Sequence, residues 1–225
     1  MADSNSFFES IRTGDFAATK SHLDADPSLA SATNPSGVSA VLLSIYAGRR
    51  EIRDLLLARG AVLQLHDAAA VGDLPRAQEL LANPHAHANA FSPDGFPAVA
   101  LAAVFGHLLV VQFLAARGAD INAISTNGSG YTALTGAVAS GHVSIVEWLL
   151  QNGANPNYRY AAGYSPLLTA AANGHLEILQ LLLAHGADSN AATNDGKSAI
   201  ALATEHNHPD IASFLQSHAQ SKSAP

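Results

Sequence analysis

The chain has no cysteine among its 225 residues. This absence excludes disulfide bridges, thiolate nucleophiles and cysteine-ligated zinc sites together. It is compatible with a reducing compartment, and we expect a cytoplasmic protein. The first residues, Met1 to Ser6, have neither the basic region nor the apolar region of a signal peptide, so no secretory signal is expected.

Basic residues are scarce. Lysine and arginine together number 11 against 18 aspartate and glutamate residues, which gives a formal net charge of −7. A face that binds phosphates needs clustered lysine and arginine. The densest basic cluster, Arg49, Arg50 and Arg53, is interrupted by Glu51 and followed by Asp54. We therefore expect no nucleic-acid partner.

Motifs of nucleophilic, nucleotide-binding and metallopeptidase sites are also missing. The sequence contains no G-x-S-x-G, no G-x-x-x-x-G-K-[ST] and no H-E-x-x-H. The carboxylates of Asp24 and Asp26 lie beside Pro27, which favours an exposed loop over paired acid–base chemistry. We expect a protein that is not an enzyme and has no cofactor.

Eleven histidines nevertheless require that a metal site be considered. Four of them recur at one repeat position, so packed helices would hold them about 10 Å apart, too far to share one metal ion. They are expected to bond to nearby backbone at helix ends, and they are His107, His142, His175 and His208. His85 and His87 lack a third ligand at a recognisable spacing, so no metal site is expected there either.

One apolar stretch, from Phe96 to Ala116, has the length of a membrane span. Pro97 and Gly106 divide it into two short helical segments, since both residues disfavour a continuous helix. We expect no membrane-spanning helix.

The most informative feature that is present is a periodic glycine. A small-residue helical segment followed by Gly-His occurs at Gly106, Gly141 and Gly174, at intervals of 35 and 33 residues. A parallel series comprises Gly95, Gly130, Gly163 and Gly196. Self-similarity at this period predicts a solenoid whose units bury their apolar faces against neighbours. Binding, rather than chemistry, is the default function of such a fold.

Two complete units show what recurs. Residues 130–155 read GYTALTGAVASGHVSIVEWLLQNGAN, and residues 163–188 read GYSPLLTAAANGHLEILQLLLAHGAD. They resemble the ankyrin repeat, G-x-T-P-L-H-x-A-A-x-x-G-H-x-x-I-V-x-x-L-L-x-x-G-A-D, over nearly the whole chain. The order of units is similar to small bacterial multi-repeat ankyrin proteins of generally unassigned role. The resemblance implies an all-α solenoid of about seven helix-turn-helix units with short β-hairpin fingers.

Residues 1–218 are predicted to form a single ankyrin-repeat domain, followed by a disordered tail at 219–225. Within the domain, glycines recur at an offset of 58 residues, for example Gly14 with Gly72 and Gly48 with Gly106. Residues 7–61 and 65–119 therefore look duplicated, and 120–218 hold three further units with a C-terminal cap. Only 24 residues separate Gly48 from Gly72, so the third unit is predicted to lack a finger and to leave a gap in the finger row.

The resemblance also implies a binding face. In ankyrin repeats the finger tips and first helices form a concave groove, and its variable positions flank the repeat glycines. Aromatic residues are enriched at these positions here, and rigid rings suit a protein or peptide partner. The predicted partner-binding residues are Tyr46, Phe96, Phe105, Tyr131, Tyr164, Tyr160, Asp94, Asn173 and Lys197. We expect a monomer.

Three functional classes are weighed. The favoured one is a non-catalytic module that binds a protein or peptide partner in the groove. An inhibitor or secreted effector acting on a host or cellular enzyme is the alternative. A small enzyme grafted on the repeats is disfavoured, because no acid–base or metal constellation converges.

Overall fold

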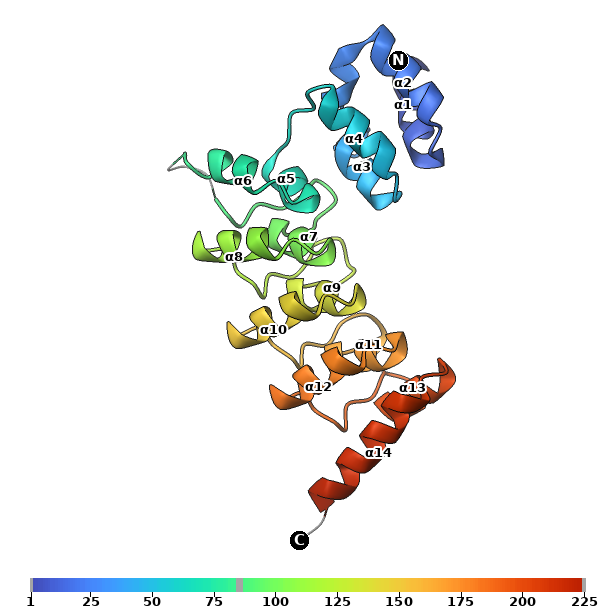
Figure 1. Ribbon diagram of the computed structural model, residues 1–225, viewed down its shortest axis with the longest axis vertical. Helices are drawn as coiled ribbons and strands as arrows, with labels where there is room; N and C mark the ends of the chain where they lie inside the picture. Colours follow the sequence, from blue (N-terminus) through green and yellow to red (C-terminus); the bar gives the residue numbers. More distant parts are fainter. Residues whose placement is uncertain (1, 84–86, 224–225) are drawn as a thin grey trace.

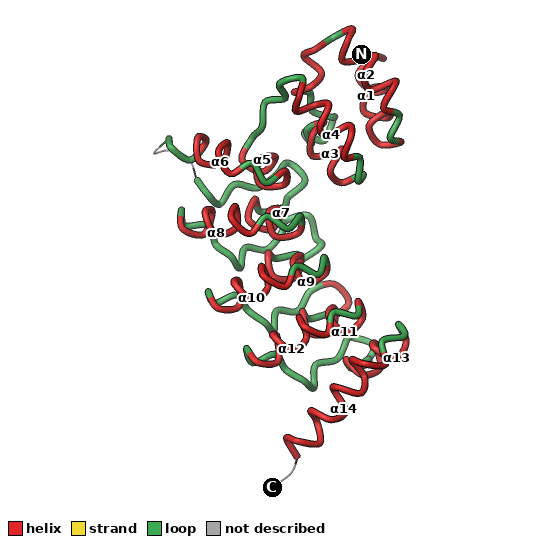
Figure 2. Tube along the Cα trace, viewed as in Figure 1, coloured by secondary structure: helices red, strands yellow, loops and turns green. Residues whose placement is uncertain are grey.

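The computed structural model describes residues 2–83 and 87–223, and in these ranges it is helical, with no strand (Figures 1 and 2). Within these ranges, fourteen α-helices and two 3-10 helices follow one another. The α-helices are α1 (Ala2–Thr13), α2 (Phe16–Ala25), α3 (Ala40–Tyr46), α4 (Arg50–Ala58), α5 (Leu65–Val71), α6 (Leu74–Leu80), α7 (Ala98–Val104), α8 (Leu108–Ala116), α9 (Ala133–Ala139), α10 (Val143–Gln151), α11 (Pro166–Asn173), α12 (Leu176–Ala184), α13 (Ala199–Glu205) and α14 (Pro209–Ser223). The 3-10 helices are η1 (Pro27–Ser31) and η2 (Ala161–Gly163).

Consecutive helices pair, and the pairs stack along one axis (Figure 1). The first helices of successive pairs form one row, in which α5, α7, α9, α11 and α13 each pack against the next. The second helices form another row through α6, α8, α10 and α12. The helical solenoid predicted from the glycine period is confirmed.

Local sequence explains where these short helices begin and end. The side chains of Thr132, Ser165 and Ser198 each accept a hydrogen bond from the backbone N–H three residues later, which caps the first helix. Gly174 ends α11 at φ 79°, a left-handed conformation that glycine adopts without steric cost. The stretch from Phe96 to Ala116 divides into α7 and α8, and no helix in the described ranges is long and apolar enough to cross a membrane.

The expected fingers are single β-bridges rather than hairpin ladders. Isolated antiparallel bridges close four of the loops that precede first helices, and they join Thr33 to Ser39, Phe91 to Pro97, Tyr160 to Tyr164 and Ala192 to Ser198. The loop before α9 is closed differently, by a hydrogen bond of 2.8 Å from Ser125 N–H to the carbonyl of Tyr131.

The third helix pair has no finger, as predicted. After α4, a linker enters α5 at Leu65, and no bridge lies between Arg59 and Leu65. The predicted gap in the finger row is wrong, however. A Cβ built on Gly37 would lie 3.0 Å from Pro93 Cβ, so the loop before α3 contacts the loop before α7 directly. Without a finger between them, the two flanking fingers close on each other.

The core is continuous and strongly apolar. Leu149 of α10 and Leu182 of α12 have no exposed surface, and both belong to the cluster of buried side chains that runs through the stack. At the C-terminus, α14 continues to Ser223 and so extends into the segment from 219 that the sequence analysis assigns to a disordered tail.

A set of hydrogen bonds, which we call the carbonyl ladder, ties most helix pairs to the preceding one. The Nε2 atoms of His107, His142 and His208 lie 3.0, 2.9 and 3.1 Å from carbonyl oxygens at the end of the preceding first helix. Those carbonyls belong to Ala70, Val104 and Ala172. Three of the four recurring histidines therefore bond to backbone, as the sequence predicts, but the backbone is that of the neighbouring unit.

Other residue types complete the ladder where histidine does not. Arg49 donates from Nη2 to the carbonyl of Arg12 at 3.2 Å, and Asn173 donates from Nδ2 to the carbonyl of Ala139 at 3.2 Å. Such a bond satisfies a carbonyl that the end of a helix leaves without an intrahelical partner. The ladder is thus a property of the stack and not of histidine alone.

The ladder is interrupted between the second and third helix pairs. The next glycine in the series, Gly48, would have nothing within 4 Å of an added Cβ, whereas the ring of His107 covers Gly72. The residue of the third pair at the ladder position is Asp73, whose side chain instead accepts from Arg76 N–H and caps α6. The second helices α4 and α6 do not pack closely as the later ones do, and the extended linker between α4 and α5 is visible in Figure 1.

Candidate functional site

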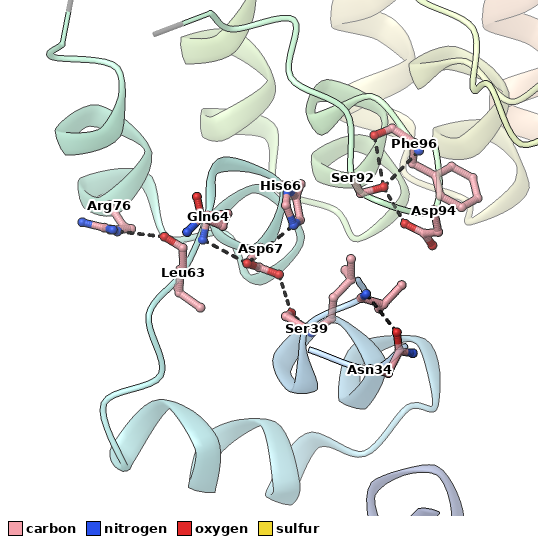
Figure 3. A network of polar contacts seen from close by, with 12 residues as sticks. Asn34, Ser39, Leu63, Gln64, His66, Asp67, Arg76, Ser92, Asp94 and Phe96 are labelled. Carbon is pink, nitrogen blue, oxygen red and sulfur yellow. Dashed lines mark hydrogen bonds and ion pairs between the residues drawn. The ribbon is translucent and has the colours of Figure 1, made fainter. Parts of the chain in front are cut away.

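At the interrupted junction, a buried carboxylate replaces the missing finger (Figure 3). Asp67 is 1% exposed. Its Oδ1 accepts from Ser39 Oγ at 2.6 Å, and its Oδ2 accepts from the backbone N–H of Gln64 at 2.9 Å. His66 Nε2 lies 3.7 Å from the same Oδ2. Asp67 therefore links α3 to α5 and caps α5 at once.

The absence of a finger in the third pair lets a side chain from α3 reach α7. The ring of Tyr46, the last residue of α3, meets the ring of Phe96 edge-on at 6.4 Å and stacks on Phe105 at 6.3 Å between centroids. Both arrangements are favourable for aromatic pairs. Three residues predicted separately from the repeat pattern thus form one cluster.

This cluster lines a cavity of about 410 Å³, which we call the aromatic hollow. It lies between α3, α7, α9 and the loops before α7 and α9. Its walls are Tyr46, Asp94, Phe96, Leu101, Val104, Phe105, Tyr131, Gly136, Ala139 and Ser140. Five of the nine predicted partner-binding residues, Tyr46, Asp94, Phe96, Phe105 and Tyr131, are brought together here.

The rings of the hollow are only partly covered. Tyr46 is 39% exposed, and Phe96, Phe105 and Tyr131 are half-buried. Phe96 and Phe105 also pack against a small apolar cluster that includes Leu101. These two rings therefore both cover the helices beneath them and present one face to the hollow.

Leu101 and Gly136 are among the wall residues that were not predicted as binding residues. They occupy the same repeat position, five residues before the helix-turn glycine, and that shared position is the signal that could have identified them. Gly136 matters for shape, because an added Cβ would lie 2.4 Å from Val104 Cγ2. Glycine at this place lets α9 approach α7 and keeps the floor of the hollow open.

The polar groups of the hollow come mainly from the loop before α7. Ser92 Oγ donates to Asp94 Oδ1 at 2.6 Å, and it also accepts from Phe96 N–H at 3.0 Å (Figure 3). Burial, followed by the negative charge of Asp94, raises the pKa of Tyr46 above its ordinary value. The Tyr46 hydroxyl is therefore protonated at neutral pH.

The other four predicted residues lie outside the hollow. Tyr160 packs against Tyr131 at 5.7 Å and is hydrogen-bonded to Thr169. Tyr164 packs against the main core. Asn173 supplies a rung of the carbonyl ladder through its bond to the carbonyl of Ala139, and Lys197 forms an exposed ion pair with Glu205 at 2.7 Å.

The described residues contain no group of three or more metal-ligating side chains. Of the histidine pair considered in the sequence, His85 lies outside the described residues. The recurring histidines are spread along the stack, and three of them bond to backbone carbonyls.

Comparison with known proteins agrees with this architecture. A family model described as ankyrin repeats (3 copies) matches residues 65–160 and 159–224. The match begins where α5 begins, so the helix pairs that precede the interrupted junction lie outside it. No curated protein matches the chain. Because the matched residues make up more than half of the chain, it belongs to the ankyrin-repeat family.

Proposed function

We propose that the protein is a non-catalytic interaction module that holds a protein or peptide partner on the aromatic hollow. Ankyrin repeats are generally protein–protein interaction modules, and the family is generally non-catalytic. The observation that carries the proposal is the convergence of Tyr46, Phe96, Phe105 and Tyr131 on one open cavity. Partly exposed rings in a preformed hollow are typical binding hot spots, because little side-chain freedom is lost on binding.

The size and chemistry of the hollow suit an apolar anchor side chain. Its volume of about 410 Å³ lies within the range of roughly 300–1,000 Å³ typical of ligand pockets. Leu101, Val104 and Ala139 supply apolar walls. Asp94 and Ser140 at its edge offer oxygen atoms that can accept hydrogen bonds from the N–H groups of a bound peptide.

The four predicted residues outside the hollow have a lesser part in this proposal. Tyr160 supports Tyr131 through their ring contact. Tyr164, Asn173 and Lys197 follow along the stack towards α13 and would contact only a partner longer than the hollow. Their bonds within the fold make them poorer hot spots than the four rings, because binding would have to compete with those bonds.

Affinity capture from a cell lysate, followed by mass spectrometry, tests the proposal. The baits are the wild-type chain, the double variant Tyr46→Ala/Tyr131→Ala, and Phe16→Ala as a matched control. Phe16 and Tyr46 are both 39% exposed, but Phe16 lies on α2, away from the hollow. Partners captured by the wild type and by Phe16→Ala should be lost from the double variant, while circular dichroism shows that all three baits are folded. Equal capture by the three folded baits would refute the proposal.

A further inference from the structure

A second cavity, of about 430 Å³, opens beside the aromatic hollow, and we call it the basic cleft. Phe105 lines both cavities, so they share a wall. The other walls of the cleft include Arg49, Arg50, Arg53 and His107, with no aspartate or glutamate among the lining residues.

The cleft exists because the carbonyl ladder is interrupted. Its lining includes Gly48, the ladder glycine that no side chain of the next helix pair covers. At the corresponding Gly72, the His107 ring lies within 2.4 Å of where a Cβ would be. The space that a ladder side chain fills elsewhere is therefore open here, and arginines surround it.

The positive charge of the cleft is only weakly compensated. Arg53 pairs with Asp54 at 2.8 Å, but their side chains are 31% and 63% exposed, and exposed pairs of this kind are weak. Arg49 donates one N–H to the carbonyl of Arg12, which is a neutral acceptor. Arg50 is exposed. In a chain of net charge −7, this is a local concentration of positive charge.

Histidine contributes no charge to the cleft at neutral pH. Burial lowers the pKa of His107, and the positive charge of Arg53 acts in the same direction, although the bond of His107 to Ala70 opposes them. His107 is therefore neutral, and the guanidinium groups alone supply the positive potential. Guanidinium groups can bind a carboxylate through two parallel hydrogen bonds.

We propose that the basic cleft binds a carboxylate side chain of the same peptide whose apolar residue occupies the aromatic hollow. The inference rests on the proposed function of the hollow. The shared wall at Phe105 makes the two subsites contiguous, and charge complementarity selects an aspartate or glutamate for the cleft. Asp94, on the loop before α7, would repel that carboxylate from the hollow, which favours its placement in the cleft.

Selection of random peptides displayed on phage tests this pairing of subsites. The targets are the wild-type chain, the cleft variant Arg50→Gln/Arg53→Gln, and the control Arg12→Gln/Lys20→Gln. The control removes the same charge from exposed ion pairs with Glu9 and Asp24, outside the cleft. Wild-type and control selections should yield peptides with an acidic residue at a fixed spacing from an aromatic or aliphatic residue. The cleft variant should keep the apolar preference and lose the acidic one.

Affinities of one selected peptide sharpen the test. Its dissociation constant, measured by fluorescence anisotropy, should rise roughly tenfold or more with the cleft variant, as expected for loss of a hydrogen bond between charged groups. Replacing the acidic residue of the peptide by its amide should weaken wild-type binding equally. The amide peptide should then bind the cleft variant no worse than it binds the wild type.

Several results would overturn the inference. Peptides without an acidic preference, an equal loss in the control variant, or tighter binding of a single-stranded oligonucleotide than of the acidic peptide would each contradict it. If no target enriches peptides, the proposed function of the hollow fails separately. The cleft alone is then tested with N-acetylglutamate. Shifts of arginine Nε–H resonances in the wild type but not in the cleft variant would support a carboxylate site, and no shift would refute it.

Discussion

The hydroxyl of Ser39 donates a hydrogen bond of 2.6 Å to the carboxylate of Asp67, across a junction of the stack at which the described residues form neither a finger nor a ladder bond. The same carboxylate accepts from Gln64 N–H at the start of α5. The buried side chain of Asp67 therefore links the two helix pairs at this junction, whereas a loop and a ladder side chain link the pairs at the other junctions.

Replacing Asp67 by alanine should cost about 2–3 kcal/mol of unfolding free energy. The change removes a buried carboxylate that accepts from both Ser39 and Gln64 N–H, and so breaks the link between α3 and α5. Ser39→Ala should cost about 1–2 kcal/mol, since it also removes the cap that Ser39 supplies to Leu42 N–H. Urea denaturation measures both values. Because the two residues share a bond, the double variant should lose less than the sum of the single losses.

The carbonyl ladder can be tested by comparing two glycines that differ in what covers them. An alanine at either Gly106 or Gly48 has to adopt positive φ, +86° or +68°, at a cost of roughly 1–2 kcal/mol. At Gly106 the new Cβ would also lie 2.8 Å from the His142 ring, whereas at Gly48 nothing lies within 4 Å. Gly106→Ala should therefore destabilise the fold by about 1 kcal/mol more than Gly48→Ala, because it displaces a ladder hydrogen bond.

Introducing His142→Ala provides the check on this comparison. In that background the additional cost of Gly106→Ala over Gly48→Ala should disappear, because the ring is gone. A difference that persists in the absence of the ring would show that the ladder contact is not its cause.

Leu149→Ala and Leu182→Ala should each cost roughly 2–5 kcal/mol, since both side chains are fully buried and alanine leaves a cavity. Coupling in a solenoid is between nearest neighbours, so the loosening should spread into adjacent pairs. Hydrogen exchange in Leu149→Ala should accelerate across residues 130–190. Leu109→Ala, at a side chain that is 65% exposed, is the control and should change stability by no more than about 0.5 kcal/mol.

The raised pKa values of two tyrosines predict that the protein loses stability at alkaline pH. Burial raises the pKa of both Tyr46 and Tyr160, so in the folded protein their phenols hold protons that the unfolded chain releases above about pH 10. Their contribution is fully present below that pH and is lost as the pH rises further. Urea midpoints should fall less steeply with alkaline pH in Tyr46→Phe/Tyr160→Phe than in the wild type.

Asp94→Asn offers a separate control for the cause of the Tyr46 shift. The negative charge of Asp94 opposes ionisation of Tyr46, so its removal should lower the pKa of Tyr46. Ultraviolet absorbance of tyrosinate during a pH titration measures this change, with Tyr46→Phe identifying the contribution. An unchanged titration in Asp94→Asn would mean that burial alone accounts for the shift.

The sequence by itself determined the repeat architecture. Periodic glycines, capping residues such as Thr132 and Ser165, and apolar stripes around Leu149 act over a single unit or between neighbours, so their spacing is enough to predict them. The same reasoning located the third unit without a finger, because a 24-residue interval leaves no room for one.

Only the tertiary structure decided what that missing finger produces. The flanking loops close at Gly37 and Pro93, and Tyr46 reaches Phe96 and Phe105 across the shortened unit. Spacing along the chain predicted a gap, because spacing alone does not show how closely the loops on either side of the shortened unit pack against each other. The aromatic positions were predicted one by one, whereas their convergence on one hollow, and the arginine-lined space beside it, depend on how rigid units stack at one irregular junction.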